Sequence, residues 1–458
     1  MGIVVRLTWA QPEDLLPHEI VQARVEGKHV DAVVAAWQAA GGTTIPEVSG
    51  AGTDPAMVAL RPLARRLLDE LQEEPAAPSP NEPESWSAII ATLSPAPRKP
   101  VGDDLRERVH GAWAGRAAGC LLGKPVEKIP RQGIEEILRA TGRWPLNDWF
   151  TAEGLPADVN ARWPWNKRSA PTSLAENING MPEDDDLNYP LLALTLLESH
   201  GREFTTEDVA QLWLDALPAG RSFTAERAAY RNILDARPVP ETATYHNPFR
   251  EWIGALIRTD VFGWVNPGDV LASARLAYED ARLSHTRNGV YGAMWAAALG
   301  AAALTASNTD EVLDAAGTII PPQSRLAHAV AFGRERGRDG DTSEAGVRQA
   351  LDAIHDEFGS LHWVHTLNNA AVIAYALQAG GGDFATSISI AVTAGWDTDS
   401  AGATVGAVVG ALAGFDGIEP RWTTPLRNSI ATSLPGGDQQ ITDLVDRTLA
   451  LISSTHSQ

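Results

Sequence analysis

The sequence reads DTDSAGATVGAVVGAL from Asp397 to Leu412. Two aspartates lead directly into a long run without charge, which predicts a buried helix whose acidic N-terminus lies at the edge of a core. Far earlier in the chain, Glu183-Asp184-Asp185-Asp186 precedes a second apolar stretch, residues 190–197. The same pattern at two distant points predicts that both acidic starts belong to one site.

Carboxylates at this density repel one another unless water, helix N-termini or divalent cations offset their charge. Either cluster alone is compatible with an acidic helix start that only complements the helix dipole. Taken together, the clusters offer hard oxygen ligands without a matching histidine or cysteine set. Such a donor set favours Mg²⁺ or Mn²⁺, so we expect a polynuclear metal site.

Glycines recur at every fourth position in two helical stretches, a spacing that places them along one helix face. Each interior glycine costs about 1 kcal/mol relative to alanine, so the rows predict a close approach of another backbone. Neither apolar run reaches the roughly 20 residues that span a bilayer. The two rows are Gly402, Gly406, Gly410 and Gly414, and Gly111, Gly115, Gly119 and Gly123.

Composition narrows the class of protein. The chain has 458 residues, 44% of them hydrophobic, which allows a large core and more than one structural unit. Its single cysteine, Cys120, excludes a disulfide framework. A net charge of −21 opposes general binding to nucleic acid or to an anionic membrane. No signal peptide is apparent, and we expect a cytoplasmic protein.

The chain is predicted to be all-α with three parts. Residues 1–75 show helical periodicity and form a small helical N-terminal domain, in which we identify no chemical constellation and whose partner is unknown. Residues 76–102 are a proline-rich linker, expected to carry few packing contacts. Residues 103–455 contain one helix after another and almost no alternating β-branched runs, so they form a multi-helix domain.

Residues 142–180 interrupt the helical pattern, and we expect a long ordered loop there. Four tryptophans occur in it among prolines, asparagines and glycines: Trp144, Trp149, Trp163 and Trp165. The rings would either line one wall of a cleft, against a base or sugar, or fasten the loop to the helical body.

Several motifs in order resemble those of the ADP-ribosylglycohydrolases. They cover about residues 105–455 and are Gly111–Gly115, Gly119–Glu127, Asp184-Asp185-Asp186, Leu283-Ser284-His285 and Gly395–Ser400. The resemblance implies an all-α domain with two Mg²⁺ ions, or Mn²⁺ in their place. It further implies hydrolysis of an N- or O-glycosidic bond at C1 of a ribose in an ADP-ribosylated substrate.

The resemblance also implies the metal ligands, namely Asp184, Asp185, Asp186, Asp397, Asp399 and Ser400. Ser400 and Asp184 stand where the family usually has threonine, and Leu187, at another threonine position, cannot ligate. A shift of the first motif by one residue would bring in Glu183.

Carried over in the same way, Glu127, Asp185 and Asp399 are the catalytic candidates, with Glu127 the outer carboxylate. The resemblance implies that the residues in contact with the substrate are Glu127, Trp252, Gly254 and His285. Trp252 is bulkier than the residues usual in the family's glycine-rich loop. Cys120 stands where the family more usually has an aspartate. Without the resemblance, His285 is equally a structural histidine at a helix start, and Glu127 an ordinary surface residue.

Three functions follow from these observations. The first is a Mg²⁺-dependent ADP-ribosyl hydrolase. The second keeps the metal chemistry and acts on another ribosylated small molecule or nucleoside. The third is a non-catalytic protein that binds ADP-ribose.

Overall fold

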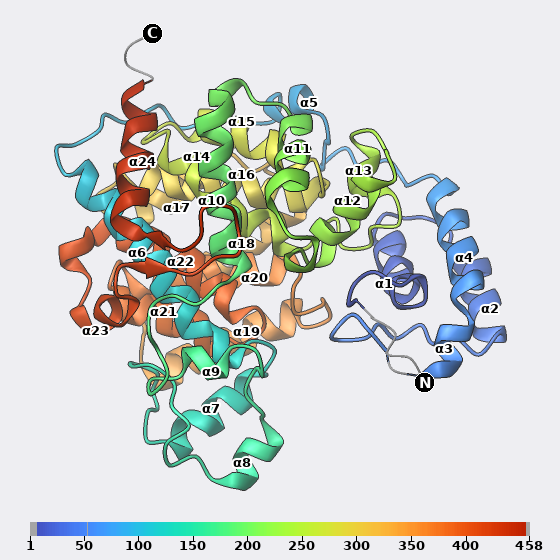
Figure 1. Cartoon of the computed structure of the whole chain (residues 1–458), viewed down its shortest axis with the longest axis horizontal. Coiled ribbons are helices and arrows are strands. Elements are labelled where there is room, and N and C mark those ends of the chain that lie inside the picture. The colour runs from blue at the N-terminus through green and yellow to red at the C-terminus, as the bar shows by residue number, and fades with distance from the viewer. Residues whose placement is uncertain (1–6, 53, 455–458) are drawn as a thin grey trace.

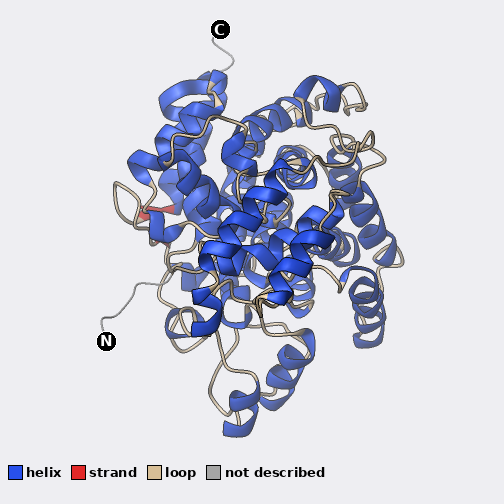
Figure 2. Ribbon diagram, turned by 90° about the vertical axis from the view of Figure 1, so that its right-hand side faces the viewer, coloured by secondary structure: helices blue, strands red, loops and turns tan. Residues whose placement is uncertain are grey.

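The structure is a computed structural model that describes residues 7–52 and 54–454. Helices dominate the described chain (Figure 2), which confirms the all-α prediction. Within the described residues, the only strands are β1 (Ser429–Ile430) and β2 (Gln439–Gln440), a short antiparallel pair. No described helix has the length and apolarity needed to cross a membrane.

The helices before residue 100 are α1 Pro12–Val25, α2 Asp31–Ala39, α3 Pro55–Ala59, α4 Arg61–Glu73 and α5 Trp86–Ile90. The α-helices that follow are α6 Leu105–Gly123, α7 Arg131–Ala140, α8 Ala157–Arg162, α9 Ala170–Ser173, α10 Asp185–His200, α11 Thr206–Ala216, α12 Thr224–Leu234, α13 Glu241–Thr244, α14 Asp260–Trp264, α15 Val270–Ala281, α16 Arg287–Ala303, α17 Thr309–Gly317, α18 Arg325–Arg336, α19 Glu344–Phe358, α20 Thr366–Gly380, α21 Phe384–Thr393, α22 Thr398–Ala413, α23 Pro420–Thr423 and α24 Ile441–Ser454. Short 3₁₀ turns are η1 Lys124–Val126, η2 Gly201–Glu203, η3 Ala219–Arg221, η4 Ile253–Arg258, η5 Phe415–Gly417 and η6 Thr424–Leu426.

Helices α6 and α22 form the centre of the large domain, and their glycine rows face each other. A Cβ atom on Gly119 would lie 1.9 Å from the carbonyl oxygen of Gly402, and one on Gly115 would lie 2.1 Å from that of Gly406. Gly111 meets Gly410 in the same way, so the two helices run in opposite directions. The predicted close approach is confirmed, and the two rows are each other's partners.

Other helices surround this pair. Helix α16 is buried along its whole length and packs on α14, α15 and η4. Helix α20 packs on α18, α21 and α22. The large domain therefore consists of helices packed around buried helices, with the starts of α10 and α22 inside it (Figure 1).

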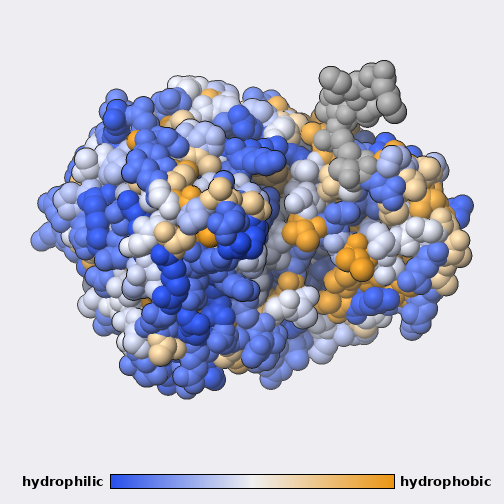
Figure 3. Space-filling view, turned by 90° about the horizontal axis from the view of Figure 1, so that it is seen from below, coloured by the Kyte–Doolittle hydropathy of each residue, from blue (hydrophilic) through white to orange (hydrophobic). Residues whose placement is uncertain are grey.

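Helices α1 to α4 form a unit of their own beside the large domain (Figure 1). Leu15 and Leu16 of α1 and Leu67 of α4 are buried where these two helices pack together. Many exposed apolar side chains of the molecule belong to this part, where Figure 3 shows hydrophobic residues gathered at the right. They include Leu7, Val21, Val25, Ile45, Val48 and Val58.

Buried contacts fix this unit to the large domain. The guanidinium of Arg250 donates to Glu19 at 2.8 and 2.9 Å and to Glu26 at 2.7 and 2.8 Å, and all three side chains are buried. Trp9 and Trp252 pack edge to face with their ring centroids 5.6 Å apart. The helical nature of residues 1–75 is confirmed over the part described, and the unit is closely joined to its neighbour.

The proline-rich segment packs along the large domain, so the expectation of few contacts is wrong. Glu82 is buried and accepts hydrogen bonds from Asn288 at 2.9 Å and from Arg325 at 2.8 Å. Ile89 of α5 is fully buried, and the backbone N–H of Lys99 donates to the Gly268 carbonyl at 3.1 Å. Proline favours an extended chain here, and side chains anchor that chain.

Residues 142–180 form a long loop that contains the short helices α8 and α9. The indole N–H of Trp149 donates to the Arg421 carbonyl at 2.9 Å, and its ring packs on Trp422 at 5.0 Å. The indole N–H of Trp163 donates to Glu136 of α7. These contacts support the interpretation that the tryptophans fasten the loop to the helical body.

Candidate active site

The two acidic clusters lie at the first turns of α10 and α22. Asp184 is the N-cap of α10, and its carboxylate accepts a hydrogen bond from the backbone N–H of Asp186 at 2.9 Å. Asp397 is the N-cap residue of α22, and Asp399 lies in its first turn. Helix starts tolerate negative charge, and both helices continue into long buried, largely apolar stretches, so the carboxylates are held at fixed positions in the core.

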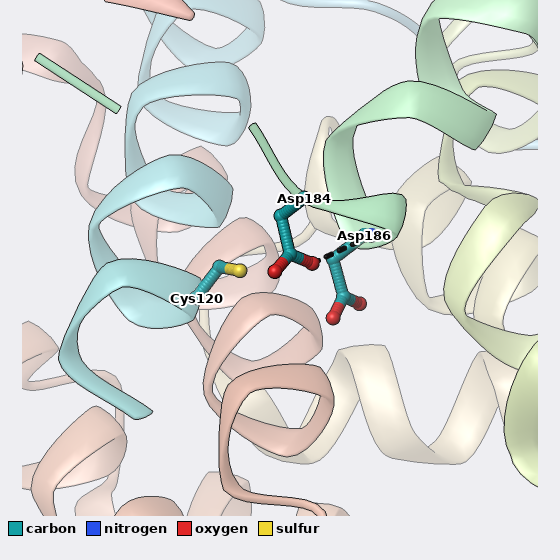
Figure 4. Close-up of side chains that lie close together, drawn as sticks. All are labelled: Cys120, Asp184 and Asp186. Carbon is teal, nitrogen blue, oxygen red and sulfur yellow. Dashed lines mark hydrogen bonds between the residues drawn. The ribbon is translucent and has the colours of Figure 1, made fainter. Parts of the chain in front are cut away.

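The clusters meet in space. The hydroxyl of Ser400 donates to the carboxylate of Asp186 at 3.2 Å, across 214 residues of sequence. Oxygen atoms of Glu127, Asp397 and Asp399 lie within 4.8 Å of one another. Cys120, Asp184 and Asp186 form a neighbouring group of the same size, shown in Figure 4. The structure therefore brings the two acidic helix starts together, as the sequence predicts.

Two buried cations oppose this negative charge. Lys124 forms an ion pair with Asp184, and its ammonium group also lies 3.3 Å from the carbonyl oxygen of Glu183. Arg116, fully buried in α6, pairs with Asp186 at 3.3 Å and with Asp260. Sequence reasoning missed both cations, although an arginine inside a glycine-lined buried helix is itself a signal.

Apart from Asp184, the aspartates of the cluster are destabilised in their charged form, and Asp186 is among them despite its contact with Arg116. Burial, followed by the charges of neighbouring carboxylates, raises the pKa of Asp185, Asp186 and Asp397 well above the usual value. Burial and the Glu127 carboxylate raise the pKa of Asp399 to about 7. Bound divalent cations would remove this repulsion, so the cluster fits them.

Hard oxygen donors make up most of the cluster, as Mg²⁺ and Mn²⁺ require. Cys120 is an unsuitable ligand for these ions, and burial, together with Asp184, raises the pKa of its thiol. Lys124 keeps the pKa of Asp184 low against the effect of burial, and the Cys120 thiol makes a smaller contribution in the same direction. Leu187 is buried one residue after Asp186 and offers no donor atom.

Glu127 lies at the edge of the cluster and is half-buried. The ammonium group of Lys128 lies 3.3 Å from one carboxylate oxygen, and the Asn166 amide donates to the other. A hollow of about 410 Å³ opens beside this carboxylate, between the segment after α6 and the 142–180 loop. Its lining residues are Glu127, Lys128, Ile129, Pro130, Arg162, Trp163, Pro164, Asn166 and Lys167.

Apart from Glu127, the expected substrate residues lie outside the acidic groups. His285 is buried, with its Nδ1 atom 2.8 Å from the Ser284 hydroxyl and its Nε2 atom 4.0 Å from Glu226. Burial and the nearby Arg258 lower its pKa, which keeps the ring neutral. Gly254 faces the same glutamate, since a Cβ atom there would lie 2.2 Å from its carboxylate.

Trp252 is buried in an aromatic cluster away from the acidic groups. Its ring stacks on His362 with centroids 4.3 Å apart and an interplanar angle of 11°. It also packs on Phe249 and on Trp9 and His18 of the N-terminal unit. The bulky side chain, a departure from the family pattern, therefore fills the junction between the two parts of the chain.

The fold and the site define a predominantly helical protein that gathers carboxylates from two helix starts into a buried cluster that could hold metal ions. Residues 102–458 match the family model for ADP-ribosylglycohydrolase, and the chain belongs to that family. The family is metal-dependent and acts on ADP-ribosylated substrates, so the chain is a glycosyl hydrolase-like protein.

One similar solved structure is described as "ADP-ribosylglycohydrolase-related protein complex". It shares 21% identity with this chain, covers 77% of it and 99% of its own length, and gives a TM-score of 0.47. No curated protein matches the chain. The family match begins at residue 102, so the N-terminal unit lies outside it.

Proposed function

We propose that this protein is a Mg²⁺-dependent hydrolase that cleaves the glycosidic bond at C1 of ribose in an ADP-ribosylated substrate. The observation that carries the proposal is the meeting of the two acidic clusters, joined by the hydrogen bond between Ser400 and Asp186. Six carboxylates, including those of Glu127 and Asp185, face two buried cations, which leaves an excess of negative charge.

Two bound divalent cations, Mg²⁺ or Mn²⁺, would balance this excess negative charge. Asp184, Asp185 and Asp186 would hold them from the start of α10, and Asp397, Asp399 and Ser400 from the start of α22. Bound there, the ions would polarise water and the ribose hydroxyls.

Glu127 is the proposed outer carboxylate. Glycosidic cleavage passes through an oxocarbenium-like state, and a positioned carboxylate can take the proton of the attacking water. Lys128 and Asn166 hold the two oxygens of Glu127 in place. Asp185 is half-buried and Asp399 lies within 4.8 Å of Glu127, so both are assigned to orient the same water.

The substrate roles of His285 and Gly254 are retained in the proposal on the strength of the family resemblance, and the structure places both residues, buried, beside Glu226. Trp252 is assigned to the junction with the N-terminal unit, so its bulk carries no argument against an ADP-ribose substrate. A hydrolase of another ribosylated small molecule or nucleoside shares the same metal chemistry and is the main alternative.

A substrate panel tests the proposal. The full-length protein is incubated with arginine-, serine- and nucleobase-linked ADP-ribose and with simple ribosides, in Mg²⁺, in Mn²⁺ and in EDTA. Release of ADP-ribose that depends on the metal supports the proposal. Release of ribose from the simple compounds alone selects the alternative substrate, and binding of ADP-ribose without turnover identifies a non-catalytic binding protein.

A further inference from the structure

The N-terminal unit contacts a tryptophan that lies near the candidate active site. The backbone carbonyl of Val48 accepts a hydrogen bond from the indole N–H of Trp363 at 3.0 Å. The Trp363 ring is half-buried, and the ammonium group of Lys128 lies 5.0 Å from its centroid. That ammonium group is also 3.3 Å from Glu127, so the contacts lead from the N-terminal unit to the edge of the acidic cluster.

A second contact ties the start of the described chain to the large domain. Arg227 of α12 donates to the backbone carbonyl of Thr8 at 2.7 Å and to its hydroxyl at 3.1 Å. Arg227 is mostly buried.

The N-terminal unit is held firmly enough to fix these side chains. The buried ion pairs of Arg250 with Glu19 and Glu26 close one part of the junction. The aromatic cluster of Trp9, His18 and Trp252 closes the part next to His362, the residue that precedes Trp363. The position of the Trp363 ring therefore depends on residues that the family match does not include.

We propose that the N-terminal unit is part of the substrate site, where its Val48 carbonyl holds Trp363 beside Lys128 as a platform for a substrate group that combines a planar ring with negative charge. An aromatic ring attracts the face of a base, and a lysine attracts phosphate. A nucleotide carries both features. The inference rests on the proposed hydrolase function and names positioning residues for it.

Three variants test the platform in the full-length protein. Trp363→Leu removes the ring, Trp363→Phe keeps a ring but removes the N–H that Val48 accepts, and Lys128→Gln removes the charge. The control is Trp86→Leu, because Trp86 is also half-buried and has Arg275 5.1 Å from its ring. Binding of ADP-ribose, ribose 5-phosphate and Mn²⁺ is measured by calorimetry, and hydrolysis gives KM and kcat.

Loss of the ring should weaken ADP-ribose binding and raise KM by about tenfold, as base–aromatic stacking does elsewhere. Trp363→Phe should weaken binding by a few fold, and Lys128→Gln should weaken both phosphate ligands. Ribose 5-phosphate has no planar ring, so Trp363→Leu should leave its binding unchanged. Mn²⁺ affinity and kcat should stay near wild type in the two Trp363 variants, whereas Lys128→Gln also removes a contact of Glu127 and should lower kcat as well.

The outcomes separate this inference from the proposed function. Equal ADP-ribose affinity in Trp363→Leu, Trp86→Leu and wild type would overturn the platform while hydrolysis stands. Binding that weakens as expected in a protein without turnover would support the platform and reject the hydrolase. A wild type that binds no ring-bearing ligand would overturn both.

Discussion

At the scale of single residues, the site is a balance between packed carboxylates and two buried cations. Lys124 offsets the charge of Asp184, Arg116 is shared between Asp186 and Asp260, and the other aspartates of the cluster repel one another. The sequence was sufficient to predict the aspartates because each cluster precedes an apolar run. It was insufficient to predict their partners, because a lysine or arginine far along the chain carries no mark of which carboxylate it will meet.

Glu127→Gln tests the proposed outer carboxylate. The amide keeps the size of the side chain and loses the ability to take a proton, so kcat should fall by about 10² to 10⁴. Mn²⁺ affinity should change little if Glu127 acts outside the metal ligands. The matched control is Glu136→Gln, since Glu136 also accepts a hydrogen bond from a side chain of the 142–180 loop. Equal activity in both variants would remove Glu127 from catalysis.

At the scale of elements, the facing glycines of α6 and α22 bring the two helix backbones into contact. The four-residue spacing predicted a glycine face on each helix and the close approach of another backbone. It did not predict that the two faces meet, because periodicity within one helix says nothing about its neighbour. This contact places Gly123, near the end of α6, against Thr398 in the acidic start of α22.

Gly406→Ala tests this contact. The new Cβ atom would lie 2.2 Å from the carbonyl oxygen of Gly115, so the helices must separate. We expect a loss of about 1–3 kcal/mol in unfolding free energy, although alanine favours a helix. Gly317→Ala is the control, because a Cβ atom there has nothing within 4 Å. In chemical denaturation, the free energy of unfolding of Gly317→Ala should equal or exceed that of wild type. Equal stability of Gly406→Ala and Gly317→Ala would contradict the tight contact.

At the scale of the whole molecule, the N-terminal unit and the proline-rich segment belong to one packed body. Composition suggested a linker with few packing contacts, because the segment is rich in proline and poor in apolar residues. Composition cannot register single anchors such as Glu82, which pairs with Arg325, or Ile89, which is fully buried. Likewise, in the sequence Glu19 and Glu26 resemble ordinary residues on the exposed face of a helix. Only the structure shows that both pair with Arg250.

Removal of residues 1–100 should therefore destabilise the large domain. Arg250 would lose both carboxylates, and breaking a buried ion pair costs about 3–5 kcal/mol. We expect a lower melting temperature and poor solubility for a chain that begins at Val101. Co-expression of residues 1–100 as a separate chain should restore part of the stability. A truncated protein that melts with wild type would instead support an independent N-terminal domain.

Acid should weaken the same junction. Burial lowers the pKa of His18 to about 4, that of His362 to about 3 and that of His365 to about 4. In the unfolded chain each of these histidines binds a proton near pH 6.5, whereas in the folded protein it stays neutral down to about pH 4. The free energy of unfolding is therefore unaffected by these histidines above pH 6.5 and decreases as the pH falls from 6.5 toward 4. At pH 5, each histidine lowers the free energy of unfolding by about 2 kcal/mol relative to its value above pH 6.5.

The measurement is the melting temperature at pH 7 and at pH 5. His18→Phe should reduce the acid sensitivity, because phenylalanine cannot take up a proton in the unfolded chain. Exposed His328 is the control position, and His328→Gln should keep the full effect. Identical pH dependence in the two variants would show that His18 does not contribute.

The central claim is that two acidic helix starts form one binuclear metal site, and titration of Mn²⁺ into wild type and Asp399→Asn tests it most directly. Asparagine keeps the shape and removes one charge, so metal affinity and turnover should fall together while the helical circular dichroism signal is unchanged. Wild type should bind two ions. Equal Mn²⁺ binding and equal hydrolysis in both proteins would contradict the account and would limit the family relationship to the fold.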